Sequence, residues 1–216
     1  MNRRRFHQLL LNTFLANVTT GFLWFALVFW VFLETRSVLV TSFMGGAYML
    51  LVAVVGVPFG TWVDRTRKRQ VMLVAQVLTT VAFALALVLF LSTPQEQLLS
   101  LSGWQLYAFV GLSLLGAVVE SARNIALSTC VTLMIDESER AQANGLVGMV
   151  GGLGFAVTSV FSGLAVGRLG ITVTLVIAVA LTVVSLVHLL FVQIPEPQIV
   201  HVDGAPRAID FAAAFR

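Results

Sequence analysis

Charged residues are scarce in this sequence. They make up 11% of its 216 residues, against about 25% in a soluble globular domain. Hydrophobic residues make up 58%. A soluble domain of this length could not bury so much apolar surface, so the composition excludes a free cytosolic enzyme and a disordered regulator. The composition predicts a protein that lies in a membrane.

Cysteine is nearly absent as well, and the sequence contains no catalytic or metal-binding motif. The one cysteine, Cys130, cannot form an internal disulfide, which excludes a disulfide-rich secreted domain. No metal-ligand cluster, catalytic triad or phosphate-binding glycine loop is present in the sequence, because Gly151-Gly152-Leu153-Gly154 lies inside an apolar run. We therefore expect no enzyme activity, no metal and no cofactor.

The basic residues give a formal net charge of +3 but form no continuous basic stretch. The 13 lysines and arginines are dispersed in short clusters between apolar runs. A nucleic-acid-binding surface needs basic residues gathered on one face. We expect no nucleic-acid partner.

Long apolar runs are the dominant feature. Each run is long enough to cross a hydrocarbon core of about 30 Å as a helix, and none shows the alternation of a barrel strand. We predict six membrane helices, over residues 9–33, 38–63, 71–91, 104–134, 143–166 and 171–192. They form a bundle over residues 1–194, followed by a linker over residues 195–216 that we expect to be cut short.

The loops predict the orientation of these helices. With a cytoplasmic N-terminus, ten lysines and arginines fall on the cytoplasmic side, and only Arg36 and Arg168 fall on the other. Cytoplasmic loops are enriched in these residues. The distribution predicts that both termini are cytoplasmic.

The sequence contains a weak internal repeat. A shift of 103 residues places Val57, Gly60 and Arg65 on Val160, Gly163 and Arg168. Because three is odd, two successive three-helix units have opposite orientations. Inverted repeats of this kind are typical of secondary transporters. Glycine pairs four residues apart, such as Gly56 with Gly60 and Gly148 with Gly152, predict close helix packing.

The segment between the second and third runs carries the most specific motif. Residues 60–69 read GTWVDRTRKR, an acidic residue followed by several cations just after a helix. This segment resembles the signature loop of the major facilitator superfamily, roughly G-x-L-a-D-R-x-G-R-K. The residues that fit are Gly60, Asp64, Arg65, Lys68 and Arg69. The resemblance implies the N-terminal six-helix half of a transporter, with a charge network around Asp64 that latches its two halves together.

Two stretches resemble one branch of that family. Residues 64–73 read DRTRKRQVML and residues 139–146 read ERAQANGL, and both are similar to the drug and macrolide efflux branch. This resemblance implies a proton-coupled exporter of drug-like or macrolide-like small molecules, in a bacterial inner (plasma) membrane. Its partners would be the small-molecule substrate, protons, the lipid bilayer, and a C-terminal six-helix half or a second copy.

Three polar residues lie in the middle of the fourth run. Glu120 is 16 residues from Trp104, about 24 Å along a helix, and Arg123 and Asn124 follow it. Charges at this depth usually face a bundle interior or a cavity. Glu120 and Arg123 form either a structural pair three residues apart, or a proton-coupling or cation-binding site. A third alternative is a helix that ends early and leaves both at the interface.

Polar residues also interrupt the first run. Asn17 and Thr20 are followed by Trp24, and the 103-residue shift places Asn17 on Glu120. These residues either form hydrogen bonds between helices or face a substrate cavity, where an aromatic ring would suit a large apolar cation or a macrolide.

Two rival interpretations of the whole chain remain. One is a self-sufficient six-helix carrier that works as a homodimer. The other is a non-transporting remnant or assembly partner. We expect a secondary transporter that works by alternating access.

Overall fold

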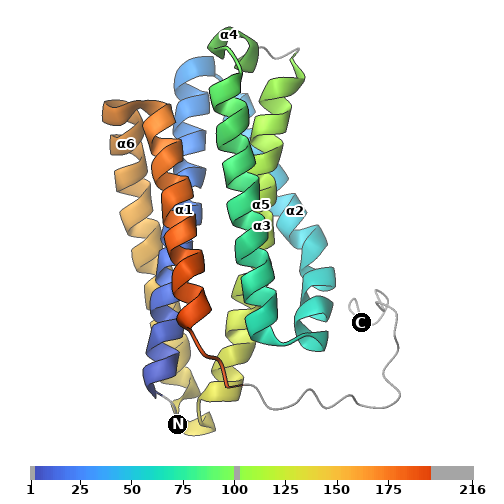
Figure 1. Ribbon diagram of the computed structural model, residues 1–216, viewed down its shortest axis with the longest axis vertical. Helices are drawn as coiled ribbons and strands as arrows, with labels where there is room; N and C mark the ends of the chain where they lie inside the picture. Colours follow the sequence, from blue (N-terminus) through green and yellow to red (C-terminus); the bar gives the residue numbers. More distant parts are fainter. Residues whose placement is uncertain (1–2, 100–102, 196–216) are drawn as a thin grey trace.

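The computed structural model describes residues 3–99 and 103–195. Within these ranges the chain is helical and contains no strand. Five helices are long and apolar enough to cross a membrane: α1 (Arg3–Thr35), α2 (Val38–Arg65), α3 (Lys68–Ser92), α5 (Trp104–Met134) and α6 (Arg140–Phe191). They lie side by side along one long axis (Figure 1). Most of the predicted linker, residues 196–216, lies outside the described residues.

Helix α6 contains a sharp break at Gly170. Gly170 has φ 78° and ψ 166°, a left-handed conformation that glycine adopts without steric strain. The chain reverses there, so that α6 consists of two arms lying side by side (Figure 1). The predicted helix 143–166 lies in the first arm, and 171–192 covers the second arm and one residue beyond it.

Short links join the first three helices. Only Arg36 and Ser37 separate α1 from α2, and Ser37 caps α2 by accepting a hydrogen bond from the Val40 amide at 3.4 Å. Only Thr66 and Arg67 separate α2 from α3. The short helix α4 (Gln95–Leu98) precedes α5, and a 3-10 turn, η1 (Glu137–Glu139), precedes α6. The hydrophobicity pattern predicted neither of these short elements.

The core is formed by α1, α3, α5 and α6. One buried cluster, which includes Leu9, Met72 and Leu127, lies toward the end that holds the N-terminus. A second buried cluster, around Phe83 and Phe109, lies toward the other end. Because these helices are apolar on all sides, hydrophobicity alone does not say which face of each helix is buried.

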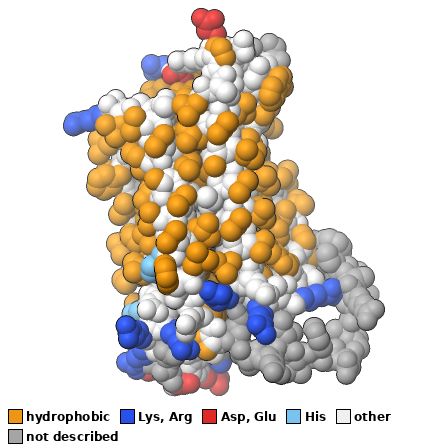
Figure 2. Space-filling model, viewed as in Figure 1, with side chains coloured by type: hydrophobic (Ala, Val, Ile, Leu, Met, Phe, Trp, Pro, Cys, Tyr) orange, Lys and Arg blue, Asp and Glu red, His pale blue; other side chains and the backbone are white. Residues whose placement is uncertain are grey.

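The outer surface has an apolar middle and polar ends. Hydrophobic side chains cover the middle of the molecule, and lysines and arginines gather at the end that carries the N-terminus (Figure 2). Helix α1 begins at that end, and the second arm of α6 ends there (Figure 1). An apolar band between charged ends is the surface that a bilayer requires, and five long apolar helices make this an integral, multi-pass membrane protein.

Two of the predicted glycine pairs do not pack against another helix among the described residues. A Cβ atom added at Gly56, Gly60, Gly148 or Gly152 would meet nothing within 4 Å. The expectation that glycine pairs bring helices of the bundle together was therefore wrong for these two. In a third pair, Gly163 with Gly167, a Cβ at Gly163 would lie 3.2 Å from the ring of Phe29 on α1. The glycines lie on α2 and on the first arm of α6, and only Met44 and Val63 of the 28 residues of α2 are buried.

We predict that Gly116→Ala on α5 destabilises the bundle. A Cβ there would clash with the ring of Phe83, a side chain that is itself fully buried. Overpacking of this kind costs about 1–3 kcal/mol. Gly111→Ala on the same helix is the control, because its Cβ would meet nothing within 4 Å. Thermal unfolding in detergent should separate the two variants, and equal midpoints would contradict the packing described here.

Candidate functional site

A buried arginine lies at the centre of the most polar part of the interior. The side chain of Arg123, on α5, is 1% exposed. Its guanidinium donates to Asn12 Oδ1 at 2.7 Å, to Gln76 Oε1 at 3.1 Å and to Glu120 Oε1 at 3.3 Å. Asn12 comes from α1 and Gln76 from α3, so one cation joins three helices.

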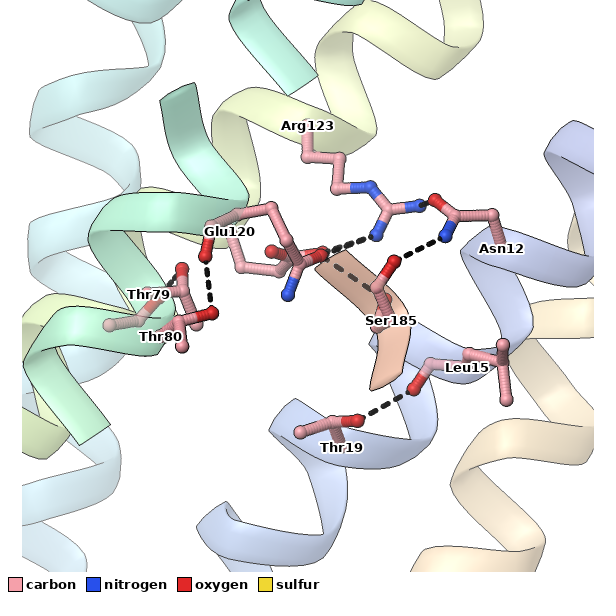
Figure 3. A network of polar contacts seen from close by, with 10 residues as sticks. Asn12, Leu15, Thr19, Thr79, Thr80, Glu120, Arg123 and Ser185 are labelled. Atoms are coloured by element: carbon pink, nitrogen blue, oxygen red, sulfur yellow. Dashed lines mark hydrogen bonds and ion pairs between the residues drawn. The ribbon is translucent and has the colours of Figure 1, made fainter. Parts of the chain in front are cut away.

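Ser185, on the second arm of α6, adds a fourth helix. Asn12 Nδ2 donates to the Ser185 carbonyl at 2.8 Å, and the Ser185 hydroxyl lies 3.3 Å from Gln76 Oε1. Arg123, Asn12 and Ser185 point toward one another, with Glu120 beside them (Figure 3). We call Asn12, Gln76, Glu120, Arg123 and Ser185 the buried polar cluster. A buried charge is tolerated when such partners replace its hydration.

Glu120 uses only half of its carboxylate in this cluster. Its Oε1 pairs with Arg123 at 3.3 Å, while its Oε2 is buried and has no hydrogen-bond partner. The ion pair lies within α5, which continues to Met134. The alternative that the helix ends early therefore does not hold. An unsatisfied buried carboxylate oxygen is costly, so Glu120 is a candidate functional residue.

Glu120 also lines a cleft with a volume of about 710 Å³. The cleft lies between α1, α2, α5 and the first arm of α6. Among the described residues that line it, Glu120 is the only acidic or basic side chain, and Asn17, Thr20, Asn124 and Thr158 add polar groups. The remaining wall is mostly apolar, which is typical of a site for a small organic molecule.

Aromatic side chains form two pairs on this wall. The rings of Trp24 and Tyr48 have centroids 5.0 Å apart, and those of Phe25 and Phe155 are 5.2 Å apart in an edge-to-face arrangement. The four rings come from α1, α2 and the first arm of α6. The cleft therefore combines a carboxylate with extended flat apolar surfaces.

Comparison with known proteins identifies the family. The family model described as Major Facilitator Superfamily matches residues 9–215, almost the whole chain. The chain belongs to the major facilitator superfamily. Members of this family are membrane transporters rather than enzymes, and they bind small-molecule substrates in a lipid bilayer. Searches of curated proteins and of solved structures returned no match.

The predicted cavity residues of this transporter fall into two groups. Asn17, Thr20, Trp24, Glu120 and Asn124 line the cleft. Arg123 does not, because it lies behind Glu120 in the buried polar cluster. Among these predicted residues, only Glu120 both lines the cleft and belongs to the buried polar cluster.

Sequence reasoning missed several residues of this transporter's interior. Asn12, Gln76 and Ser185 complete the buried polar cluster, and Tyr48 lines the cleft. Asn12 and Gln76 are polar residues inside otherwise apolar runs, which was a usable signal. Tyr48 carried no such signal, because an aromatic residue in a membrane helix most often faces lipid or core.

The signature loop of the transporter is short. Gly60, Asp64 and Arg65 lie in the last turns of α2, and Lys68 and Arg69 open α3. Asp64 is exposed and has no hydrogen bond or ion pair to any described residue. Arg67, which stands where the family often has glycine, has φ −60° and therefore needs no glycine.

Arg69 ties this loop to the end of α6. Its Nε donates to the Val192 carbonyl and one terminal guanidinium nitrogen donates to the Leu190 carbonyl, both at 3.0 Å. The last carbonyls of a helix have no partner within the helix, so a cation there satisfies them and complements the helix dipole. The loop thus fixes the position of α3 relative to the second arm of α6.

We predict that Arg123→Met destabilises the transporter by roughly 3–5 kcal/mol, because it leaves Glu120 buried without its partner. Adding Glu120→Leu should restore part of this loss, since the orphaned carboxylate is removed while Asn12 and Gln76 still lack their donor. We expect the thermal unfolding midpoint in detergent to be highest for the wild type, intermediate for the double variant and lowest for Arg123→Met. A double variant less stable than the single variant would contradict the arrangement of the buried polar cluster.

Proposed function

We propose that this chain forms a six-helix bundle of a secondary transporter that exports drug-like or macrolide-like molecules in exchange for protons. Transport would proceed by alternating access, with the cleft as the substrate site. The observation that carries the proposal is Glu120, a carboxylate that lines the cleft, pairs with Arg123 through one oxygen and has no partner for the other.

The position of Glu120 suits the exchange of a proton. Protonation would remove the negative charge of the Glu120–Arg123 pair, while Asn12 and Gln76 would continue to hold the guanidinium. The net charge of the pair would then change from zero to +1 beside the cleft. The other titratable group that lines the cleft among the described residues is Tyr48, from α2. Of the other cleft helices, α1 and the first arm of α6 contribute only neutral side chains to the described wall.

Reciprocal packing supports two inverted three-helix repeats. We take the two arms of α6 as separate membrane helices divided at Gly170, which gives six spans. Helix α1 packs on both arms of α6, and α5 packs on α2 and α3. The first helix of each repeat thus packs against the second and third helices of the other.

Residue spacing across the cleft agrees with this division. Three pairs of cleft residues are 103 residues apart: Asn17 with Glu120, Gly21 with Asn124, and Tyr48 with Gly151. This is the shift of the internal repeat. Related positions of the two repeats would therefore face one shared cavity, as in transporters with inverted repeats.

The open glycines support a second bundle as the partner. Gly45, Gly46 and Gly56 on α2, and Gly148 and Gly152 on the first arm of α6, have nothing within 4 Å of an added Cβ. Small residues allow helix backbones to approach closely. The partner would be a C-terminal six-helix half or a second copy of this chain, packed on the face formed by α2 and the first arm of α6.

The basic end of the molecule supports cytoplasmic termini. Arg3, Arg65, Arg69 and Arg140 lie at the helix ends near the N-terminus, whereas Arg36 and Arg168 lie near the opposite end. This asymmetry follows the distribution found in cytoplasmic loops. A bacterial inner membrane is proposed from the resemblance of residues 64–73 and 139–146 to efflux proteins.

We predict that Glu120→Gln abolishes proton-coupled transport. The amide keeps an oxygen for Arg123 but cannot carry a proton, so proton flux driven by a panel of drug-like compounds and a macrolide should fall at least about tenfold. The measurement uses the full chain in liposomes with an internal pH dye. Glu96→Gln, at the exposed helix α4, is the control and should transport normally. Undiminished proton flux in Glu120→Gln would refute the role of Glu120.

We predict that Gly148→Leu blocks transport without unfolding the bundle. A Cβ at this position would meet nothing within 4 Å. The free energy of unfolding should therefore stay within about 0.5 kcal/mol of the wild-type value. The added bulk would, however, keep the second bundle away. Val88→Leu, on an exposed part of α3, is the matched control. Normal transport by Gly148→Leu would show that this face does not receive a partner.

A cysteine at the same position distinguishes the possible partners. The natural Cys130 is buried, so Gly148→Cys would provide an accessible thiol. Cross-linked dimers with transport would identify a second copy as the partner. Transport without such dimers would favour a C-terminal half, and inert monomers would favour the non-transporting alternative.

A further inference from the structure

The cleft also indicates what kind of substrate it accepts. We propose that it binds monovalent organic cations that carry aromatic rings, with Glu120 as the counter-ion, and that it rejects anions of the same size. This inference rests on the proposed function because it takes the cleft as the substrate site. It goes further by naming the charge and the surface of the substrate.

The charge distribution around the cleft is one-sided. Glu120 lines the cleft, whereas Arg123 lies behind it and does not reach the described wall. The pair is therefore a dipole with its negative end toward the cleft. No lysine, arginine or histidine is among the described residues that line the cleft, so nothing there would attract an anion.

The terminal nitrogens of Arg123 are engaged away from the cleft, and its Nε is buried without a partner. Both of its terminal nitrogens donate to partners, one to Asn12 Oδ1 and the other to Gln76 Oε1 and Glu120 Oε1. An anionic substrate could recruit the terminal nitrogens only by breaking hydrogen bonds to two other helices, and no atom of Arg123 reaches the described wall of the cleft. Glu120 Oε2, in contrast, has no partner to lose. A cation would supply the positively charged partner that this oxygen lacks.

The aromatic wall determines the rest of the specificity. Trp24 and Tyr48 line the cleft together with Glu120, and their paired rings present π surfaces that attract cations. Phe25 and Phe155 extend the flat apolar surface. A compact inorganic cation would leave these rings uncovered, whereas a cation with its own aromatic groups could contact the carboxylate and the rings together.

Two ions of the same shape and opposite charge provide the test. Tetraphenylphosphonium and tetraphenylborate have nearly equal size, so binding that depends on shape or partition alone would not favour the cation. We expect saturable binding of tetraphenylphosphonium to the full chain in nanodiscs, with quenching of tryptophan fluorescence, and at least tenfold weaker binding of tetraphenylborate. Comparable binding of the two ions would overturn the inference.

Variants locate the cation in the cleft. Glu120→Gln should weaken tetraphenylphosphonium binding at least tenfold, and Glu96→Gln should leave it unchanged. If Glu120→Gln fails to fold, Trp24→Leu and Tyr48→Leu test the same site from its wall, with an expected loss of about fivefold each. Retained affinity in all the folded cleft variants would place the cation elsewhere and overturn the inference.

Equilibrium binding separates this inference from the proposed function. Charge-selective binding without proton-coupled flux would leave the cation site standing and would refute the transport mechanism. Proton-coupled flux of neutral compounds, together with no preference for tetraphenylphosphonium, would do the reverse.

Discussion

The interior of this bundle is organised around one buried positive charge. Arg123 is 1% exposed and touches side chains from α1, α3 and its own helix, while Asn12 and Gln76 extend the contacts to α6. A guanidinium away from water is stable only where the protein supplies acceptors, and both terminal nitrogens of Arg123 have them, while its Nε is buried without one. The relative positions of four helices are therefore constrained at one level of the bundle, in a way that apolar packing alone would not provide.

The same constraint explains why the two sides of Glu120 differ. One oxygen belongs to the buried polar cluster, and the side chain also contributes to the wall of a cleft that contains no other charge among its described residues. The alternatives of a structural ion pair and a functional carboxylate are thus compatible. The pairing with Arg123 holds Glu120 in position, and its other oxygen is buried without a hydrogen-bond partner.

Much of the fold could be predicted from the sequence, because a long apolar run between basic loops fits a membrane helix and little else. The Gly60–Arg69 segment indicated the family, which the family comparison confirms. The partners of Arg123 were not predicted. Gln76 and Ser185 are 109 residues apart in the sequence. In a helix that is apolar on all sides, the hydrophobic pattern does not show which face points into the bundle. Two of the glycine pairs misled for a related reason, since a small residue permits close packing without saying which helix fills the space.

The two-residue links on either side of α2 limit how this transporter can move. Ser37 and Arg36 join it to α1, and Thr66 and Arg67 join it to α3. Because consecutive Cα atoms are 3.8 Å apart, the helix ends joined by each link can separate by no more than about 11 Å. Helix α2 has only two buried residues, yet both of its ends stay close to the neighbouring helices in the chain. A movement of either end of α2 must therefore carry the adjoining end of α1 or α3 with it.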